Sequence, residues 1–126
     1  MKNIPLEKLE EKCVDLLTTT YISLGQYKYD PETTMILAKK LARDLKRRYT
    51  MLNWKAVEIA FDDGINESDG FVNAHTWGKW LNKMKKMIWE GMYNLNNGNQ
   101  HLITPELKEI FETHPLITNK QKLIKN

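Results

Sequence analysis

Cysteine is scarce in this 126-residue chain, where Cys13 stands alone. A single cysteine excludes an intramolecular disulfide and any zinc site built from several thiolates. Cys13 lies among apolar residues at helical spacing, and no basic cluster lies beside it in sequence to lower its pKa. We therefore expect a small buried side chain rather than a reactive thiol.

Long apolar runs are also lacking. No stretch approaches the ~20 apolar residues that a bilayer-spanning helix needs, so no membrane partner is expected. The N-terminal sequence MKNIPLEKLEEKC turns acidic where a secretory signal peptide would carry its apolar core. Secretion by a signal peptide is therefore not expected.

Motifs that bind phosphates or metals, or supply a nucleophile, are missing as well. The six glycines are dispersed, which excludes a P-loop and a dinucleotide-binding loop. No Gly-x-Ser-x-Gly elbow occurs, and His75, His101 and His114 have no ligand partner at helical spacing. The acidic stretch 62–72 fits a calcium-binding EF-hand loop in neither glycine register. We interpret the chain as a non-enzyme with no cofactor, metal or small-molecule substrate.

Helical periodicity is the main positive signal. Five segments carry apolar residues at helical spacing, and their expected starts are Pro5, Asp30, Asn53, Asn73 and Thr104. Their expected ends lie near Leu24, Tyr49, Gly64, residues 94–99, and His114-Pro115. The sequence DDGINESDGFV at 62–72 is rich in Gly, Asp and Ser and is predicted to be a loop.

The predicted fold is all-α, a compact bundle of about five helices with a basic C-terminal arm. Short connections between the helices favour a bundle over a solenoid. Residues 1–116 would form the helical domain. Residues 117–126 contain three lysines and no long apolar stripe, so we expect them to extend from the body as an arm.

The formal net charge of +3 is small, but acidic and basic blocks alternate along the chain. The net charges are −2 for residues 1–35, +5 for 36–60, −4 for 61–76, +3 for 77–95 and +1 for 96–126. Such alternation suits self-association or docking on a charged partner at least as well as nucleic-acid binding.

Two helices present candidate binding faces. Six cations fall within ten positions of the second helix, and they are compatible with a solvated face, phosphate contact or docking on an acidic protein surface. On the fourth helix, Trp77 and Trp80 follow the apolar stripe and are expected in the core, whereas Trp89 lies off it and is a candidate exposed anchor. The candidate partner-binding residues are Lys39, Lys40, Arg43, Lys46, Arg47, Arg48, Lys79, Lys83, Lys86, Trp89, Lys120, Lys122 and Lys125.

The stretch from Asp30 to Leu81 resembles small helical proteins of gut-Bacteroidetes phages and mobile elements. The matching features are the Asp30–Glu32 start, an Ala-containing helix that ends at Tyr49, Ala60-Phe61 with Gly64, and Phe71 leading to Trp80-Leu81. A helical body with a terminal arm is also similar in outline to the head–tail connector (adaptor) proteins of tailed phages. The resemblance implies a place in the virion or the host cytoplasm.

The leading hypothesis is a phage-type structural or adaptor protein that assembles with itself or with other virion proteins. Its partners would be protein subunits, in a homo-oligomer or a larger assembly. The alternative is a nucleic-acid-binding accessory protein of phage replication or regulation, which would lay its basic second helix along phosphates.

Overall fold

The computed structural model describes residues 1, 3–25, 30–67 and 73–113. Within them the chain is all-helical, as the sequence predicts. Five α-helices and one short 3₁₀ helix follow each other along the chain: α1 (Leu6–Ser23), α2 (Pro31–Arg48), α3 (Trp54–Glu67), α4 (Ala74–Asn96), η1 (Gln100–Leu102) and α5 (Pro105–Thr113). The expected arm at 117–126 and the stop at His114-Pro115 lie outside the described residues.

Asparagine and aspartate side chains start three of the helices where the sequence predicts them. The Asp30 carboxylate accepts a hydrogen bond from the Thr33 amide (2.6 Å), and Pro31 occupies the first position of α2. The Asn53 side chain accepts from the Ala56 amide (2.9 Å) at the start of α3, and Asn73 accepts from the Thr76 amide (3.0 Å) at the start of α4. Each cap satisfies an amide that has no partner within its helix.

The predicted end of the third helix at Gly64 is wrong, and so is the predicted loop at 62–66. The helix α3 continues to Glu67, and Gly64 is buried inside it. The reason lies in packing, because a Cβ atom at Gly64 would collide with the indole ring of Trp80 on α4. Glycine at this position permits a close approach of two helices and does not mark a helix end.

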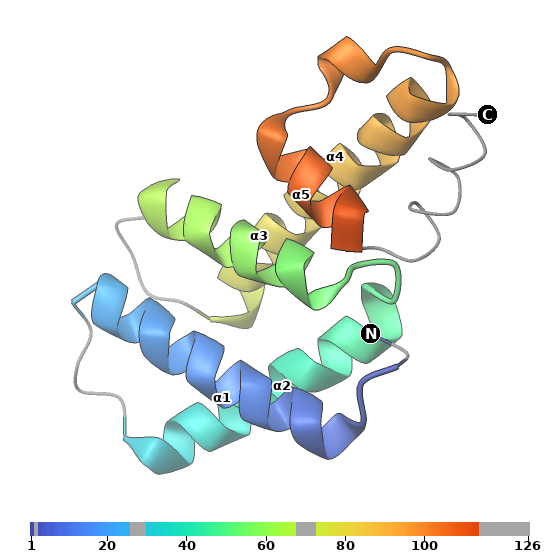
Figure 1. The fold of residues 1–126 in the computed structure, drawn as a ribbon. Helices are drawn as coiled ribbons and strands as arrows, with labels where there is room; N and C mark the ends of the chain where they lie inside the picture. Colours follow the sequence, from blue (N-terminus) through green and yellow to red (C-terminus); the bar gives the residue numbers. More distant parts are fainter. Residues whose placement is uncertain (2, 26–29, 68–72, 114–126) are drawn as a thin grey trace.

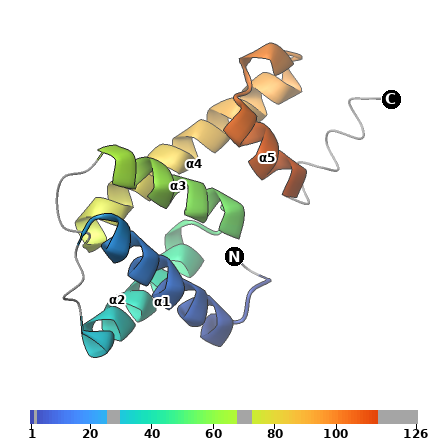
Figure 2. The same cartoon turned by 60° about the vertical axis from the view of Figure 1, so that its left-hand side comes forward.

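The helices lie in two layers (Figures 1 and 2). In Figure 1, α1, α3 and α5 form the nearer layer, α2 crosses behind α1, and α4 runs behind α3 and α5. Helix contacts agree with this arrangement, since α3 packs on both α1 and α5 while α2 packs on α4. Between the layers, α1 packs on α2, and α4 packs on α3 and α5.

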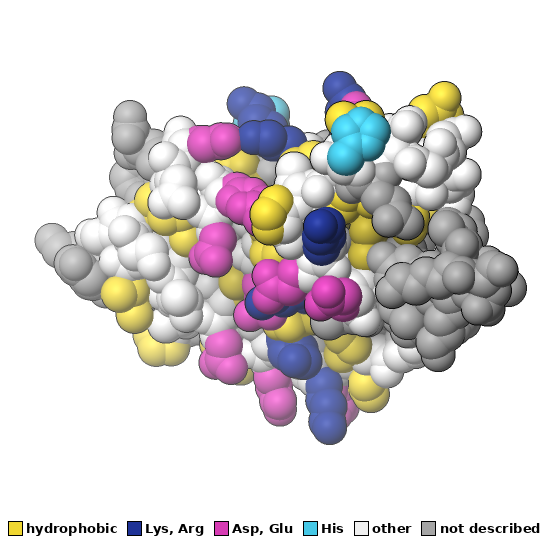
Figure 3. All heavy atoms as spheres, turned by 45° about the horizontal axis from the view of Figure 1, so that its top comes forward, with side chains coloured by type: hydrophobic (Ala, Val, Ile, Leu, Met, Phe, Trp, Pro, Cys, Tyr) yellow, Lys and Arg dark blue, Asp and Glu magenta, His cyan; other side chains and the backbone are white. Residues whose placement is uncertain are grey.

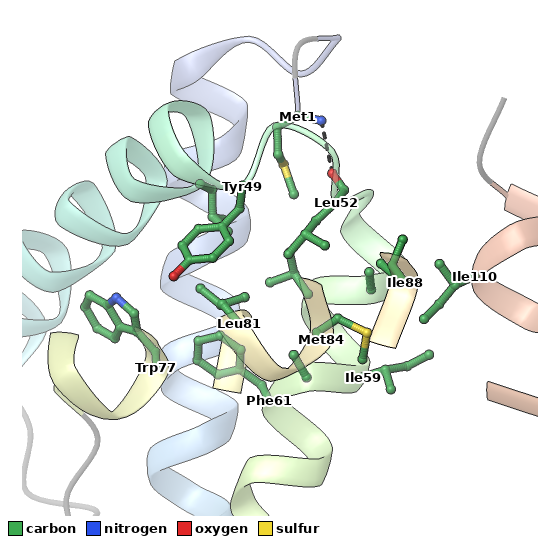
Figure 4. Close-up of a cluster of buried hydrophobic side chains, with 14 of the residues drawn as sticks. Met1, Tyr49, Leu52, Ile59, Phe61, Trp77, Leu81, Met84, Ile88 and Ile110 are labelled. Atoms are coloured by element: carbon green, nitrogen blue, oxygen red, sulfur yellow. Dashed lines mark hydrogen bonds between the residues drawn. The ribbon is translucent and has the colours of Figure 1, made fainter. Parts of the chain in front are cut away.

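The core fills the space between the two layers. Trp77, Leu81, Met84 and Ile88 of α4 belong to one buried cluster that includes side chains from all the other α-helices, and Figure 4 draws part of it. Trp77 is fully buried, as expected, and so is Cys13. Trp80 differs from the expectation. It is only half-buried, because it covers Gly64 at the edge of the core and contacts Phe61 edge-to-face with a centroid distance of 5.3 Å.

The N-terminal methionine and the helix α5 pack at the edges of this core and are held there by hydrogen bonds. The Met1 side chain is buried, and the Met1 amine donates a hydrogen bond to the Leu52 carbonyl (3.3 Å), which is drawn in Figure 4. The side-chain amide nitrogen of Asn53 donates a hydrogen bond to the Ile110 carbonyl of α5 (3.2 Å). Asn53 therefore caps α3 and also holds α5 against it.

Replacing Gly64 should test the close approach of α3 and α4. We expect Gly64→Ala to lower the free energy of unfolding by about 1–3 kcal/mol, because the new methyl group overpacks against Trp80. Gly78→Ala in α4 is the matched control, since a Cβ there meets nothing within 4 Å and improves helix propensity by up to about 1 kcal/mol. Urea unfolding measures the free energy of unfolding of both variants. Equal changes in the two variants would contradict the packing role of Gly64.

Candidate interaction surfaces

The two layers carry opposite charge. Counted over Lys, Arg, Asp and Glu, the helices α1, α3 and α5 have net charges of −2, −3 and −2, whereas α2 and α4 have +4 and +3. We call the first three helices the acidic layer and the other two the basic layer. The acidic and the basic helices therefore belong to different layers.

The cations predicted on the second helix do not all face away from the acidic layer, since Lys39 lines a hollow together with Glu10 and Asp15 of α1. Lys39, Lys40, Arg43, Arg47 and Arg48 are exposed, and Lys46 is half-buried. Among described residues, no carboxylate lies within ion-pair distance of any of them except Asp44, which is 3.9 Å from the Lys40 ammonium. Their role in binding stays a prediction.

Asp44 and Tyr49 join this basic face to α4. The Asp44 carboxylate accepts a hydrogen bond from the Trp77 indole nitrogen (3.3 Å), and the Tyr49 hydroxyl donates to the Asn82 side chain (2.9 Å). Burial raises the pKa of Tyr49 above its ordinary value, and the nearby positive charge of Arg48 acts in the opposite direction. The cationic end of α2 therefore lies beside the N-terminal half of α4.

The three lysines predicted on the fourth helix do not share one environment. Lys79 and Lys86 are exposed, and no described carboxylate lies within ion-pair distance of either. The Lys83 ammonium instead lies 2.8 Å from the Glu67 carboxylate of α3, whose hydrogen bond and negative charge raise the pKa of Lys83. Lys83 therefore lies at the boundary between the two layers.

Trp89 is exposed as predicted, with 59% of its surface accessible. The sequence analysis missed its neighbour Tyr93, which follows by one helical turn and is 67% exposed. The i, i+4 spacing of two aromatic residues off the apolar stripe was a usable signal for this pair. Lys120, Lys122 and Lys125, also predicted to bind partners, lie outside the described residues.

The three helices of the acidic layer bring carboxylates close to one another. Figure 3 shows Asp and Glu side chains gathered on one face, with cationic side chains among them. Asp15 of α1 shares a hollow of about 330 Å³ with Glu58 and Asp62 of α3. On the α5 side, the negative charge of Asp63 is the main cause that raises the pKa of Glu106, followed by desolvation and a hydrogen bond that the protonated Glu106 donates to the Asp63 carboxylate. The two carboxylates therefore repel each other when both are charged.

Nothing among the described side chains forms a group of three or more His, Cys, Asp or Glu placed to hold a metal ion. No helix in the described ranges has the length and apolar character needed to cross a bilayer. Comparisons with protein-family models, curated protein sequences and solved structures gave no match.

Cys13 should be inert in the folded protein. Its side chain is fully buried, and burial, together with the charge of Glu10, raises its pKa to about 12. We expect its alkylation by iodoacetamide to be at least about 100-fold slower in the native protein than in urea. Thr18→Cys places an exposed thiol on the same helix and serves as the positive control. Rapid labelling of native Cys13 would contradict the buried position.

Proposed function

We propose that this chain is a non-enzymatic assembly protein of the structural or adaptor type, whose copies associate by placing the basic layer of one against the acidic layer of the next. The observation that supports it is the separation of charge between the layers, −7 over α1, α3 and α5 and +7 over α2 and α4. Complementary faces of this kind steer encounter and fix the register of a complex.

The geometry of such an association is heterologous, because the two contacting surfaces differ. Contacts of this kind generate a closed ring when the rotation between copies closes and an open filament when it does not. A two-fold dimer is different, because each copy would contribute the same patch. Through the basic layer, such a dimer would place basic helices against basic helices. The charge pattern favours the heterologous arrangement.

Repulsion within each layer supplies part of the driving force. Glu106 and Asp63 repel each other in the isolated chain, as the raised pKa of Glu106 indicates. Arg43 and Arg47 lie one turn apart on α2 and have no described carboxylate within ion-pair distance. Bringing the two surfaces together relieves both repulsions, and each exposed ion pair formed contributes about 0.2–1 kcal/mol.

The phage-type setting belongs to the proposal and is supported only by the sequence resemblance. In that setting the assembly would serve a virion structure such as the head–tail connector, or a complex in the host cytoplasm. Other virion proteins with an acidic or a basic face could replace one neighbour, because the contact depends on charge complementarity and not on the identity of the partner.

Neutralising one layer at a time tests the assembly. We expect the wild-type chain to form oligomers at low ionic strength that dissociate as salt is raised, since exposed charges are screened beyond about 8 Å at 0.15 M salt. Arg43→Gln/Arg47→Gln removes two charges from the basic layer, and Glu58→Gln/Asp62→Asn removes two from the acidic layer. Each should weaken self-association by about tenfold, as measured by analytical ultracentrifugation.

An equimolar mixture of the two variants tests whether the basic layer of one copy contacts the acidic layer of another. Each variant keeps one intact face, so an equimolar mixture should recover pairing and stop at a heterodimer. Arg43→Lys/Arg47→Lys keeps both charges and is the control that should associate like the wild type. A wild-type monomer at low salt and high concentration, or variants that associate as tightly as the wild type, would refute the proposal.

A further inference from the structure

The C-terminal half of α4 carries a second surface, separate from the contact between α2 and α4. Trp89 and Tyr93 follow Asn82 by seven and eleven residues, which places them roughly 10 and 16 Å further along the helix axis. In Figures 1 and 2 this end of α4 lies beside α5 and away from α1 and α2. A ligand there would leave the outer face of α2 accessible.

Trp89 and Tyr93 line a shallow hollow. Its other lining residues are Glu90 and Asn94, and its volume is about 410 Å³. Two aromatic rings one turn apart on an exposed helix surface lose little conformational entropy on binding and offer flat π faces. The carboxylate of Glu90 and the amide of Asn94 supply acceptors and a donor at the edge of the same hollow.

Cations continue from this hollow along the same side of α4. Lys86 precedes Tyr93 by seven residues and Lys79 precedes Lys86 by seven, so the three side chains share one face of the helix. Lys79 and Lys86 are exposed and have no described carboxylate within ion-pair distance. A stripe of cations therefore leads to a pair of exposed rings.

We propose that this hollow binds an unpaired nucleobase and that α4 is a binding surface for single-stranded nucleic acid. Trp89 and Tyr93 would stack against the base, while Glu90 and Asn94 face its hydrogen-bonding edge. Lys86 and Lys79 would contact phosphates of the flanking nucleotides. The combination of a cationic track with stacking rings is what such a strand requires, and a duplex would hide its bases from the rings.

The same features argue against an apolar protein helix as the occupant. Such a partner would need a continuous apolar groove, but a carboxylate and an amide line the hollow beside the two rings. Among the exposed aliphatic side chains, Leu6, Ile22, Met35 and Ile36 belong to α1 and α2, and Leu102 belongs to η1, which packs on α4. Charge and aromatic character together favour a polyanion with flat bases.

Fluorescence anisotropy with the full-length chain tests this proposal. The probes are labelled single-stranded DNA and RNA of about 15 nucleotides and a DNA duplex of the same length. We expect both single strands to bind more tightly than the duplex and to weaken as salt is raised. Comparable binding of DNA and RNA would mean that stacking dominates, and a preference for either would identify the strand that the site takes.

Substitutions separate stacking from general charge attraction. Trp89→Ala and Tyr93→Ala should each weaken single-strand binding by about fivefold or more, whereas Trp89→Phe should retain most of it. Ile36→Ala, a truncation at an equally exposed site on α2, should leave affinity unchanged. Lys79→Gln/Lys86→Gln should reduce the dependence on salt without removing the preference for single strands. Circular dichroism checks that each variant keeps its helical content.

The proposal is overturned if neither single strand binds at low salt, if the duplex binds more tightly, or if both alanine variants bind like the wild type. Sedimentation of the same samples shows whether the chain is monomeric, so that strand binding and self-association are read separately. Strand binding by a chain that stays monomeric would support this inference and count against assembly. Oligomers that bind no strand would support the assembly proposal and count against strand binding.

Discussion

Helices α3 and α4 can pack as closely as they do because residue 64 has no side chain. Trp80 lies flat over Gly64 and meets Phe61 edge-to-face, so α3 lies deep against the basic layer. From this central position α3 also contacts α1 and α5. The order of the acidic layer therefore depends on one close approach, and a larger side chain at residue 64 would push apart the two layers that the rest of the molecule is built on.

Segregating charge by layer has an energetic consequence for the isolated chain. Carboxylates of α1 and α3 share one hollow, Asp63 of α3 lies close enough to Glu106 of α5 to raise its pKa, and Lys83 pairs with Glu67 across the layers. A surface with intermixed charges would be more stable, since like charges side by side repel. Proteins tolerate such local costs mainly where a partner relieves them, and this reasoning supports a binding role for both faces.

Much of this fold follows from local rules, and the departures have identifiable physical reasons. Side-chain caps at Asp30, Asn53 and Asn73 depend on a few neighbouring residues, so the sequence predicts those helix starts correctly. Gly64 shows the limit of such reasoning, because glycine serves equally well to end a helix or to admit a neighbouring helix, and only the tertiary partner decides. Acidic and basic blocks are visible in the sequence, but their separation into two layers depends on which helices pack together. Tyr93 is a different case, because its i, i+4 spacing from Trp89 is visible in the sequence and only its exposure needs the structure.

The two proposals are compatible when the assembly contact is made through α2, the part of the basic layer that leaves Lys79, Lys86 and the hollow on α4 accessible, and symmetry then relates them. A nucleic-acid strand has a direction, so a protein that follows it must repeat with the same orientation at each step. Heterologous association of acidic and basic layers gives that repeat, because every copy relates to the next by the same operation. The hollow at Trp89 and Tyr93 would then recur at a fixed interval along the assembly, with its lysine stripe aligned in one direction. A two-fold dimer would present its two hollows in opposite directions and match a single strand poorly. The charge pattern of the layers and the polarity of the proposed ligand therefore favour the same kind of assembly.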